Sequence, residues 1–206
     1  AVLSSGEDDL LLVSQRGQAM RFSAADDVLR PMGRATAGVK GMRFKDDDEL
    51  LSMCVTSDGD YLLVATEGGY GKRTAMEEYP AKGRGGLGVT TLKYQPKRGK
   101  LIGALAVNEG DEIMAITSAG GVIRTEVSQI RPSSRSTMGV RLVNLPNGVS
   151  LYAIDRNVED SGEEQAEAIA RGEVDGPAEK NPVQAQAQLE VDGSDTDANG
   201  VPTEED

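Results

Sequence analysis

The feature that most constrains the fold of this chain is a motif that recurs three times at a spacing of about 51 residues. Each copy begins with an apolar stretch that runs into a glycine turn: "LLLVSQRGQAMRF" around Gly17, "YLLVATEGGYGKRT" around Gly69 and "IMAITSAGGVIRT" around Gly120. In every copy an arginine follows the aligned glycine by four residues, at Arg21, Arg73 and Arg124. A fixed period of this length is typical of proteins made of stacked units, in which only a neighbouring unit covers the apolar face of the next.

The second half of each copy is a loop in which an arginine is followed, after three residues, by Gly-Val. The three loops read "GRATAGV" at 33–39, "GRGGLGV" at 83–89 and "SRSTMGV" at 134–140. Their arginines are Arg34, Arg84 and Arg135, spaced 50 and 51 residues apart. Each copy then closes with another apolar strand, which begins at Leu50, Leu101 or Leu151.

The pattern within one copy predicts an all-β unit. Short aliphatic and β-branched runs alternate with glycine turns, and no stretch keeps a helical period, which indicates about four antiparallel strands and hence one blade of a propeller-type fold. We expect blades at 9–59, 60–110 and 111–156, with residues 1–8 as the end of a preceding blade. Three blades make a poor closed ring, so we expect the chain to be a fragment of a larger protein.

The charge is concentrated in the last part of the chain. Residues 157–206 carry 15 acidic and 2 basic side chains, whereas residues 1–156 carry 19 acidic and 20 basic ones. The segment has no aromatic residue and few large aliphatic ones, so it cannot bury enough apolar surface to offset the entropy of ordering. We expect a disordered acidic tail at 157–206.

Several classes of function are disfavoured by the composition. The chain has no histidine and only one cysteine, Cys54, which argues against histidine-based hydrolysis, a zinc cluster and an internal disulfide. No clusters of carboxylates recur in register across the repeats, so an enzyme with a site in a propeller channel is disfavoured and no cofactor is expected in this chain. Without a membrane-length apolar run or signal peptide, we expect no membrane association and a cytoplasmic location.

The candidate site is a basic, glycine-rich region in the middle repeat. Between residues 72 and 100 there are 8 basic side chains against 2 acidic ones. Because the three arginine loops occupy the same place in each repeat, a stack of blades would place them in a row along one rim, where a long polyanion could bind. The glycines let the backbone approach phosphate closely. The predicted DNA-contacting residues are Arg34, Lys72, Arg73, Lys82, Arg84, Gly85, Gly86, Gly88, Lys93, Arg98 and Arg135.

Two structural alternatives apply to these residues. The strand arginines Arg21, Arg73 and Arg124 could serve only to cover apolar surface with their aliphatic stems. The glycines around Arg84 could merely turn a flexible chain. A propeller that binds another protein through its rim is also compatible with the pattern.

The repeats resemble the C-terminal domain of DNA gyrase A over residues 1–156, and the acidic tail is similar too. That domain is a six-bladed β-pinwheel whose blades exchange a strand and which bends duplex DNA around a basic rim. The resemblance implies wrapping of DNA without reading its sequence, in support of ATP-dependent negative supercoiling by the whole enzyme. The implied partners are duplex DNA, the N-terminal part of gyrase A, and gyrase B. The catalytic residues would lie outside this chain.

The loop "KGRGGLG" resembles the signature box of that family, Gln-Arg-Arg-Gly-Gly-Lys-Gly. It keeps the box residues Arg84, Gly85, Gly86 and Gly88, while Lys82, Gly83 and Leu87 replace the Gln, Arg and Lys. This departure resembles the degenerate second box of later blades in actinobacterial gyrases. A near alternative is the equivalent C-terminal domain of topoisomerase IV. We also hypothesise that the acidic tail competes with DNA phosphates for the basic rim.

Overall fold

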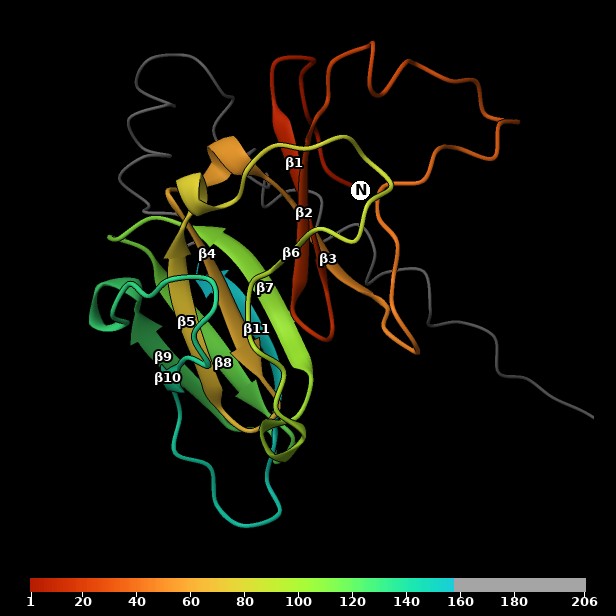
Figure 1. Cartoon of the computed structure of the whole chain (residues 1–206). Helices are drawn as coiled ribbons and strands as arrows, with labels where there is room; N and C mark the ends of the chain where they lie inside the picture. Colours follow the sequence, from red (N-terminus) through yellow and green to blue (C-terminus); the bar gives the residue numbers. More distant parts are fainter. Residues whose placement is uncertain (158–206) are drawn as a thin grey trace, which may run out of the picture. The chain divides into compact units, whose positions relative to one another are not determined.

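The computed structural model describes residues 1–157, which form three antiparallel β-sheets (Figure 1). The predicted tail, except for its first residue, Asn157, lies outside the described residues. The only helices in the described part are four short 3-10 turns: η1 (Thr56–Asp58), η2 (Met76–Glu78), η3 (Pro96–Arg98) and η4 (Val127–Gln129). None of them is long and apolar enough to cross a membrane.

Each sheet takes most of its strands from one repeat, and the predicted all-β, propeller-type fold is confirmed. The first sheet has the order β3 (Leu50–Val55), β1 (Asp9–Ser14), β2 (Gln18–Ser23), β6 (Val89–Thr90). The second has the order β7 (Leu101–Val107), β4 (Tyr61–Thr66), β5 (Tyr70–Ala75), β10 (Val140–Arg141). The third comprises β11 (Leu151–Asn157), β8 (Glu112–Thr117) and β9 (Val122–Glu126).

The aligned glycines form the hairpin turns that join β1 to β2, β4 to β5 and β8 to β9. Gly17, Gly69 and Gly120 have φ of 84°, 77° and 82°, a left-handed conformation that glycine adopts without the steric cost of a Cβ atom. Their N–H groups donate to the carbonyls of Ser14, Thr66 and Thr117 at 3.0, 2.9 and 3.0 Å. The sequence signal at these positions therefore reports a turn geometry that all three repeats share.

The outer strand of each of the first two sheets comes from the following repeat. The two-residue strand β6, from the second repeat, pairs with β2 through Gln18↔Thr90 and Ala19↔Val89, and β10 from the third repeat pairs with β5. Both strands begin at the Val of a Gly-Val pair, so the arginine loop of one repeat leads into the edge of the previous sheet. This is the strand exchange that the family resemblance implies.

The core lies between successive sheets. Along β4, Leu62 and Val64 pack in one cluster with Leu11 and Val13 of β1. The alternate residues Leu63 and Ala65 pack in another cluster with β8, as the two-residue side-chain period of a strand requires. The edge strand β7 of the second sheet contacts β3 and β11, which are the corresponding edge strands of the first and third sheets. These three strands form the inner edge of the unit. The arginine loops lie at the opposite, outer edge.

Candidate nucleic-acid interface

The three arginine loops end in the same backbone conformation at the outer edge. Gly38, Gly88 and Gly139 have φ of 76°, 73° and 73°. A Cβ atom on Gly88 would lie 2.2 Å from the carbonyl oxygen of Ala19, and one on Gly139 would lie 2.5 Å from that of Gly71. These two glycines are needed because the loop presses against the edge strand of the previous sheet.

Neighbouring loops are joined by equivalent contacts of their arginines. Nη1 of Arg84 donates to the carbonyl of Lys40 at 3.4 Å, and Nη1 of Arg135 donates to that of Thr90 at 3.3 Å. Lys40 and Thr90 occupy the same position, directly after Gly-Val, in the preceding loop. The loops of Arg34, Arg84 and Arg135 therefore lie in succession, as the sequence predicted.

These loop arginines remain accessible to a ligand. Arg34 and Arg84 are exposed and Arg135 is half-buried. Nε of Arg84 donates to the carbonyl of Val28 at 2.9 Å in addition to the contact with Lys40. A guanidinium carries five N–H donors, so Arg84 keeps donors for a phosphate group while these two bonds hold it in place.

The glycines of the middle loop pack against the first repeat. The N–H of Gly85 donates to the carbonyl of Gly41 at 2.5 Å, and the N–H of Arg43 donates to that of Gly86 at 2.7 Å. A Cβ on Gly86 would lie 3.2 Å from Cε of Met20. The amide of Gly85 is therefore already bonded within the protein. Gly85, Gly86 and Gly88 shape the loop that presents Arg84.

The prediction of phosphate contacts by Lys72 and Arg73 is wrong, because both side chains are enclosed between sheets. Lys72 is 0% exposed and Arg73 is 2% exposed. Nε of Arg73 donates to the carbonyl of Ile130 at 2.5 Å, Nη2 forms an ion pair with Glu109 at 2.9 Å, and the guanidinium lies 4.7 Å from the centre of the Tyr61 ring. Lys72 binds three oxygens of the third arginine loop.

Arg21 has the same structural role one repeat earlier. Its Nη1 donates to the carbonyls of Met76 and Tyr79 at 3.3 Å each, and its Nε pairs with Asp9 at 2.7 Å. Arg21 and Arg73 therefore have a structural role, but they act through hydrogen bonds to the next repeat and not, as the alternative proposed, only by covering apolar surface. The third member, Arg124, is 57% exposed and pairs with Glu112 at 3.6 Å.

Of the remaining predicted residues, some lie on the surface and one lies at a contact between repeats, here called a joint. Lys82 and Lys93 are exposed. Arg98 is half-buried: its Nη1 donates to the carbonyl of Met138 at 2.6 Å and its guanidinium lies 4.0 Å from the centre of the Tyr70 ring. Arg98 therefore supports the third arginine loop, and the side chains best placed to meet a polyanion are Arg34, Lys82, Arg84, Lys93 and Arg135.

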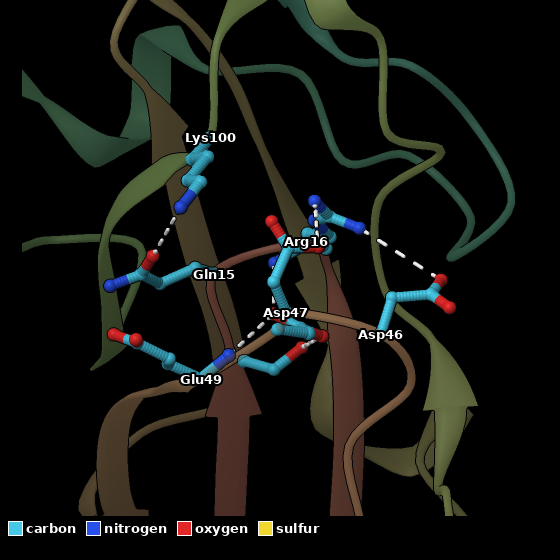
Figure 2. A network of polar contacts seen from close by, with 8 residues as sticks. Gln15, Arg16, Asp46, Asp47, Glu49 and Lys100 are labelled. Atoms are coloured by element: carbon cyan, nitrogen blue, oxygen red, sulfur yellow. Dashed lines mark hydrogen bonds and ion pairs between the residues drawn. The ribbon is translucent and has the colours of Figure 1, made fainter.

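Basic side chains at the tip of the β1–β2 hairpin are occupied by polar and acidic partners. Figure 2 shows Arg16 paired with Asp46 and Asp47, the Asp46 contact being 3.9 Å, while Lys100 donates to Gln15 at 3.2 Å. Sequence reasoning did not identify this network, because Arg16 and the acidic run lie thirty residues apart. Its carboxylates disfavour a polyanion at this tip, which leaves the arginine loops as the candidate interface.

A family model described as "DNA gyrase C-terminal domain, beta-propeller" matches the chain three times, at residues 8–57, 60–108 and 111–154. The chain belongs to this family. Each match covers one repeat and contains one of the loop arginines Arg34, Arg84 and Arg135. The resemblance inferred from the sequence is thus confirmed.

Similar curated proteins are named as the A subunit of DNA gyrase and come from actinobacteria. The chain is 61% identical over 166 residues to that of Mycobacterium bovis (strain BCG / Pasteur 1173P2), which covers 81% of this chain and 20% of the relative. It is 54% identical over 179 residues to that of Streptomyces coelicolor, covering 87% of this chain and 21% of the relative. The chain therefore spans about a fifth of the length of these relatives.

Two solved structures share the gyrase-family fold with this chain. A DNA gyrase A C-terminal domain superimposes with a TM-score of 0.67 at 29% identity, covering 74% of this chain and 52% of that one. A C-terminal domain of DNA topoisomerase IV superimposes with a TM-score of 0.74 at 26% identity, covering 84% of this chain and 54% of that one.

Proposed function

We propose that this chain binds duplex DNA without reading its sequence and helps to wrap it, as part of the C-terminal domain of a DNA gyrase A. In the whole enzyme it would support ATP-dependent negative supercoiling, together with the N-terminal part of gyrase A and with gyrase B. The observation that carries the proposal is the succession of equivalent arginine loops at the outer edge. Their donors suit phosphate groups, which position a duplex but carry no base information.

The repetition of the loops suits the energetics of wrapping. Bending 20 to 30 base pairs through 40 to 90 degrees costs on the order of 1 to 6 kcal/mol. A single exposed arginine cannot supply that free energy, whereas several loops held at fixed spacing can share it. The joints made by Arg84 and Arg135 to the preceding loops fix that spacing before DNA binds.

The proposal is tested by measuring binding of the full chain to a fluorescent duplex of about 40 base pairs at two salt concentrations. We expect Arg84→Ala to weaken binding and to reduce the slope of log affinity against log salt by about 1. The control is Arg156→Ala on β11, at the inner edge, where Arg156 pairs with Asp111 at 3.6 Å. Equal affinity of the native chain and the Arg34→Ala, Arg84→Ala and Arg135→Ala variants would instead favour a rim that binds protein.

The proposed role of the acidic tail remains a separate hypothesis. The segment 157–206 carries a net charge of -13 from 15 acidic and 2 basic residues, and tethering gives it a high effective concentration near basic side chains. If it competes with phosphates, removing residues 158–206 should increase DNA affinity most at low salt. Unchanged affinity after truncation would leave it a solubilising segment.

The alternative assignment is the equivalent domain of topoisomerase IV, favoured by the TM-score of 0.74 with such a structure. The sequence relatives favour gyrase, since identities with gyrase A proteins reach 61%. A supercoiling assay separates the two. A gyrase A that contains this segment should introduce negative supercoils in the presence of gyrase B and ATP if the gyrase assignment is right.

A further inference from the structure

A buried lysine lies directly beneath the third arginine loop. Lys72 is 0% exposed, and its Nζ donates to the carbonyl of Ser134 at 2.5 Å, to that of Arg135 at 2.6 Å and to the hydroxyl of Thr137 at 3.2 Å. Ser134 and Thr137 are the first and last residues of a turn closed by the Thr137 N–H at 3.3 Å. An ammonium group has three donors, so all of them are used on this turn.

The backbone of Arg135 is held on its other side as well. Its N–H donates to Oε2 of Glu78 at 3.0 Å, while its carbonyl accepts from Lys72. Both polar backbone groups of Arg135 are therefore bound by side chains of the preceding repeat. With the main chain fixed at two points, its guanidinium projects along the outer edge, where it reaches the carbonyl of Thr90.

The middle loop is supported in a different way. The residue that corresponds to Lys72 in the first repeat is Met20, one position before the strand arginine in each case. The residue that corresponds to Thr137 is Gly86, two positions after the loop arginine, and a Cβ on Gly86 would lie 3.2 Å from Met20. An apolar Met–Gly contact in one joint is thus replaced by a polar Lys–Thr contact in the next.

We propose that Lys72 is a positioning residue for DNA binding: its ammonium holds the turn from Ser134 to Thr137 and so fixes Arg135 at the outer edge without touching DNA itself. This inference rests on the proposed function of the arginine loops. It assigns to Lys72 an effect on DNA affinity that acts through Arg135 alone, because its buried ammonium is enclosed by the protein.

The charge state of Lys72 gives a distinctive readout. Burial lowers the pKa of Lys72 to about 8, with Arg135 acting in the same direction and Glu78 opposing. A neutral amine has only two N–H donors for three acceptors, so the turn is held less firmly above that pH. The chain has no histidine that could titrate near pH 8. Burial raises the pKa of Tyr79 above its ordinary value of 10, so its hydroxyl does not titrate near pH 8 either.

The test compares DNA affinities of full-length Lys72→Met, Arg135→Ala and the double variant, with Lys45→Met as a control that removes an equal charge from an exposed site. We expect Lys72→Met and Arg135→Ala each to weaken binding about threefold, and the double variant to bind no more weakly than Arg135→Ala. Native affinity should also fall between about pH 7 and pH 9, whereas that of Lys72→Met should not. Additive effects, or a native-like affinity of Lys72→Met beside a weakened Arg135→Ala, would overturn the proposal.

A DNA-independent measurement separates this proposal from the proposed function. Hydrogen exchange of the segment 133–139 should be faster in Lys72→Met than in Lys45→Met, with equal exchange in the β1–β2 hairpin. If Arg135→Ala binds DNA normally, the proposed function fails at this loop, and exchange still decides whether Lys72 holds the turn. Should Lys72→Met not fold, Thr137→Val removes the hydroxyl that accepts from Lys72 and donates to the carbonyl of Ser134. Unchanged exchange in that variant would count against the inference.

Discussion

At the scale of single residues, the joints between repeats depend on buried cations. Arg73 is 2% exposed, and its bonds cross from β5 to the carbonyls beside η4 and to Glu109. The carbonyl of the buried Ile130 would lose a charge-assisted partner if the guanidinium were removed. A buried polar group left without its partner costs more than an exposed ion pair contributes.

We therefore expect Arg73→Met to lower the free energy of unfolding by about 2 to 4 kcal/mol. The matched control is Arg124→Met at the same repeat position, where the side chain is 57% exposed and the cost should stay below about 1 kcal/mol. Urea unfolding of both variants measures the difference. Equal losses would mean that the two positions make equivalent contributions despite their different burial.

The pH dependence of stability follows from Lys72. Its pKa is lowered from 10.5 to about 8, mainly by burial, so between these values the unfolded chain keeps a proton that the folded chain has released. Stability therefore rises with pH over this interval. Burial raises the pKa of the Tyr79 hydroxyl, which makes stability fall once tyrosine ionises in the unfolded chain, above about pH 10.

Urea midpoints of the native chain should accordingly increase from about pH 8 to about pH 9.5, and Lys72→Met should remove most of the increase. A midpoint in the native chain that falls steadily over this interval would contradict the assignment. The variant introduces the residue that already occupies the corresponding position, Met20, so its side chain is compatible with a related joint.

The same two residues mark the limit of reading a site from sequence. Lys72 and Arg73 belong to a basic run and were expected to meet DNA, but β5 packs between two neighbouring repeats. An outward-facing strand shows one polar face, whereas a strand enclosed on both sides buries consecutive residues regardless of charge. Arg34, Arg84 and Arg135 were predictable because their equal spacing implied equal places on the outer edge, and their accessibility is independent of which strand face is buried.

At the scale of elements, the strand exchange is the device that joins one sheet to the next. The exchanged strands β6 and β10 have two residues each, which is too short for an alternating pattern to reveal. Their sequence marker is the Gly-Val pair that precedes or begins them. The longer strands were predictable because apolar runs and turn glycines recur in register, whereas the partner of a two-residue strand is set by contacts across repeats.

Gly88→Ala and Gly38→Ala form a matched pair that isolates this exchange. Both glycines have positive φ, 73° and 76°, so both substitutions carry a backbone cost of about 1 kcal/mol. Only Gly88 has a neighbour in the way, the carbonyl of Ala19 at 2.2 Å from a Cβ, while Gly38 has none within 4 Å.

We expect Gly88→Ala to lower the free energy of unfolding by at least about 2 kcal/mol and to destabilise the pairing of β6 with β2, whereas Gly38→Ala costs about 1 kcal/mol. Thermal unfolding gives the stability difference, and hydrogen exchange at Ala19 and Val89 reports the pairing. If the two variants lose equal stability, close packing at Gly88 contributes nothing beyond the backbone conformation.

At the scale of the whole described unit, apolar side chains are exposed at both ends. The outer face of the first sheet has a cavity of about 450 Å³ lined mainly by side chains such as Leu10, Leu12, Phe22 and Met53. At the other end, no strand of residues 1–157 pairs with the outer edge of β9, where Val122 is 57% exposed. An open strand edge beside apolar side chains favours association with another chain.

The isolated chain should therefore self-associate as its concentration rises, and Val122→Lys should weaken this association by placing a charge on the open edge. Sedimentation velocity over a concentration series gives the result. The comparison variant is Tyr152→Lys, which places the same charge at a residue that is 75% exposed on β11. A native chain that sediments as a monomer throughout would show that the open edge is protected.

The propeller-type architecture was predictable from the repeat alone, because a sheet with two apolar faces requires a neighbour on each side. The contacts between repeats could not be predicted from the sequence, since they depend on which loop reaches which sheet.

The exchanged strands have a consequence for how such a domain could change in number of blades. Each repeat of about 51 residues contains both a donor, the Gly-Val strand, and an acceptor, the edge of its hairpin. A duplication or deletion of one whole repeat would thus keep donors and acceptors alternating along the chain, because Gly88 and Gly139 meet equivalent positions, the carbonyls of Ala19 and Gly71. Loss of half a repeat would separate a donor strand from its acceptor edge and so disrupt the contacts with both neighbouring repeats. A whole repeat is therefore the unit that can be duplicated without disrupting the fold.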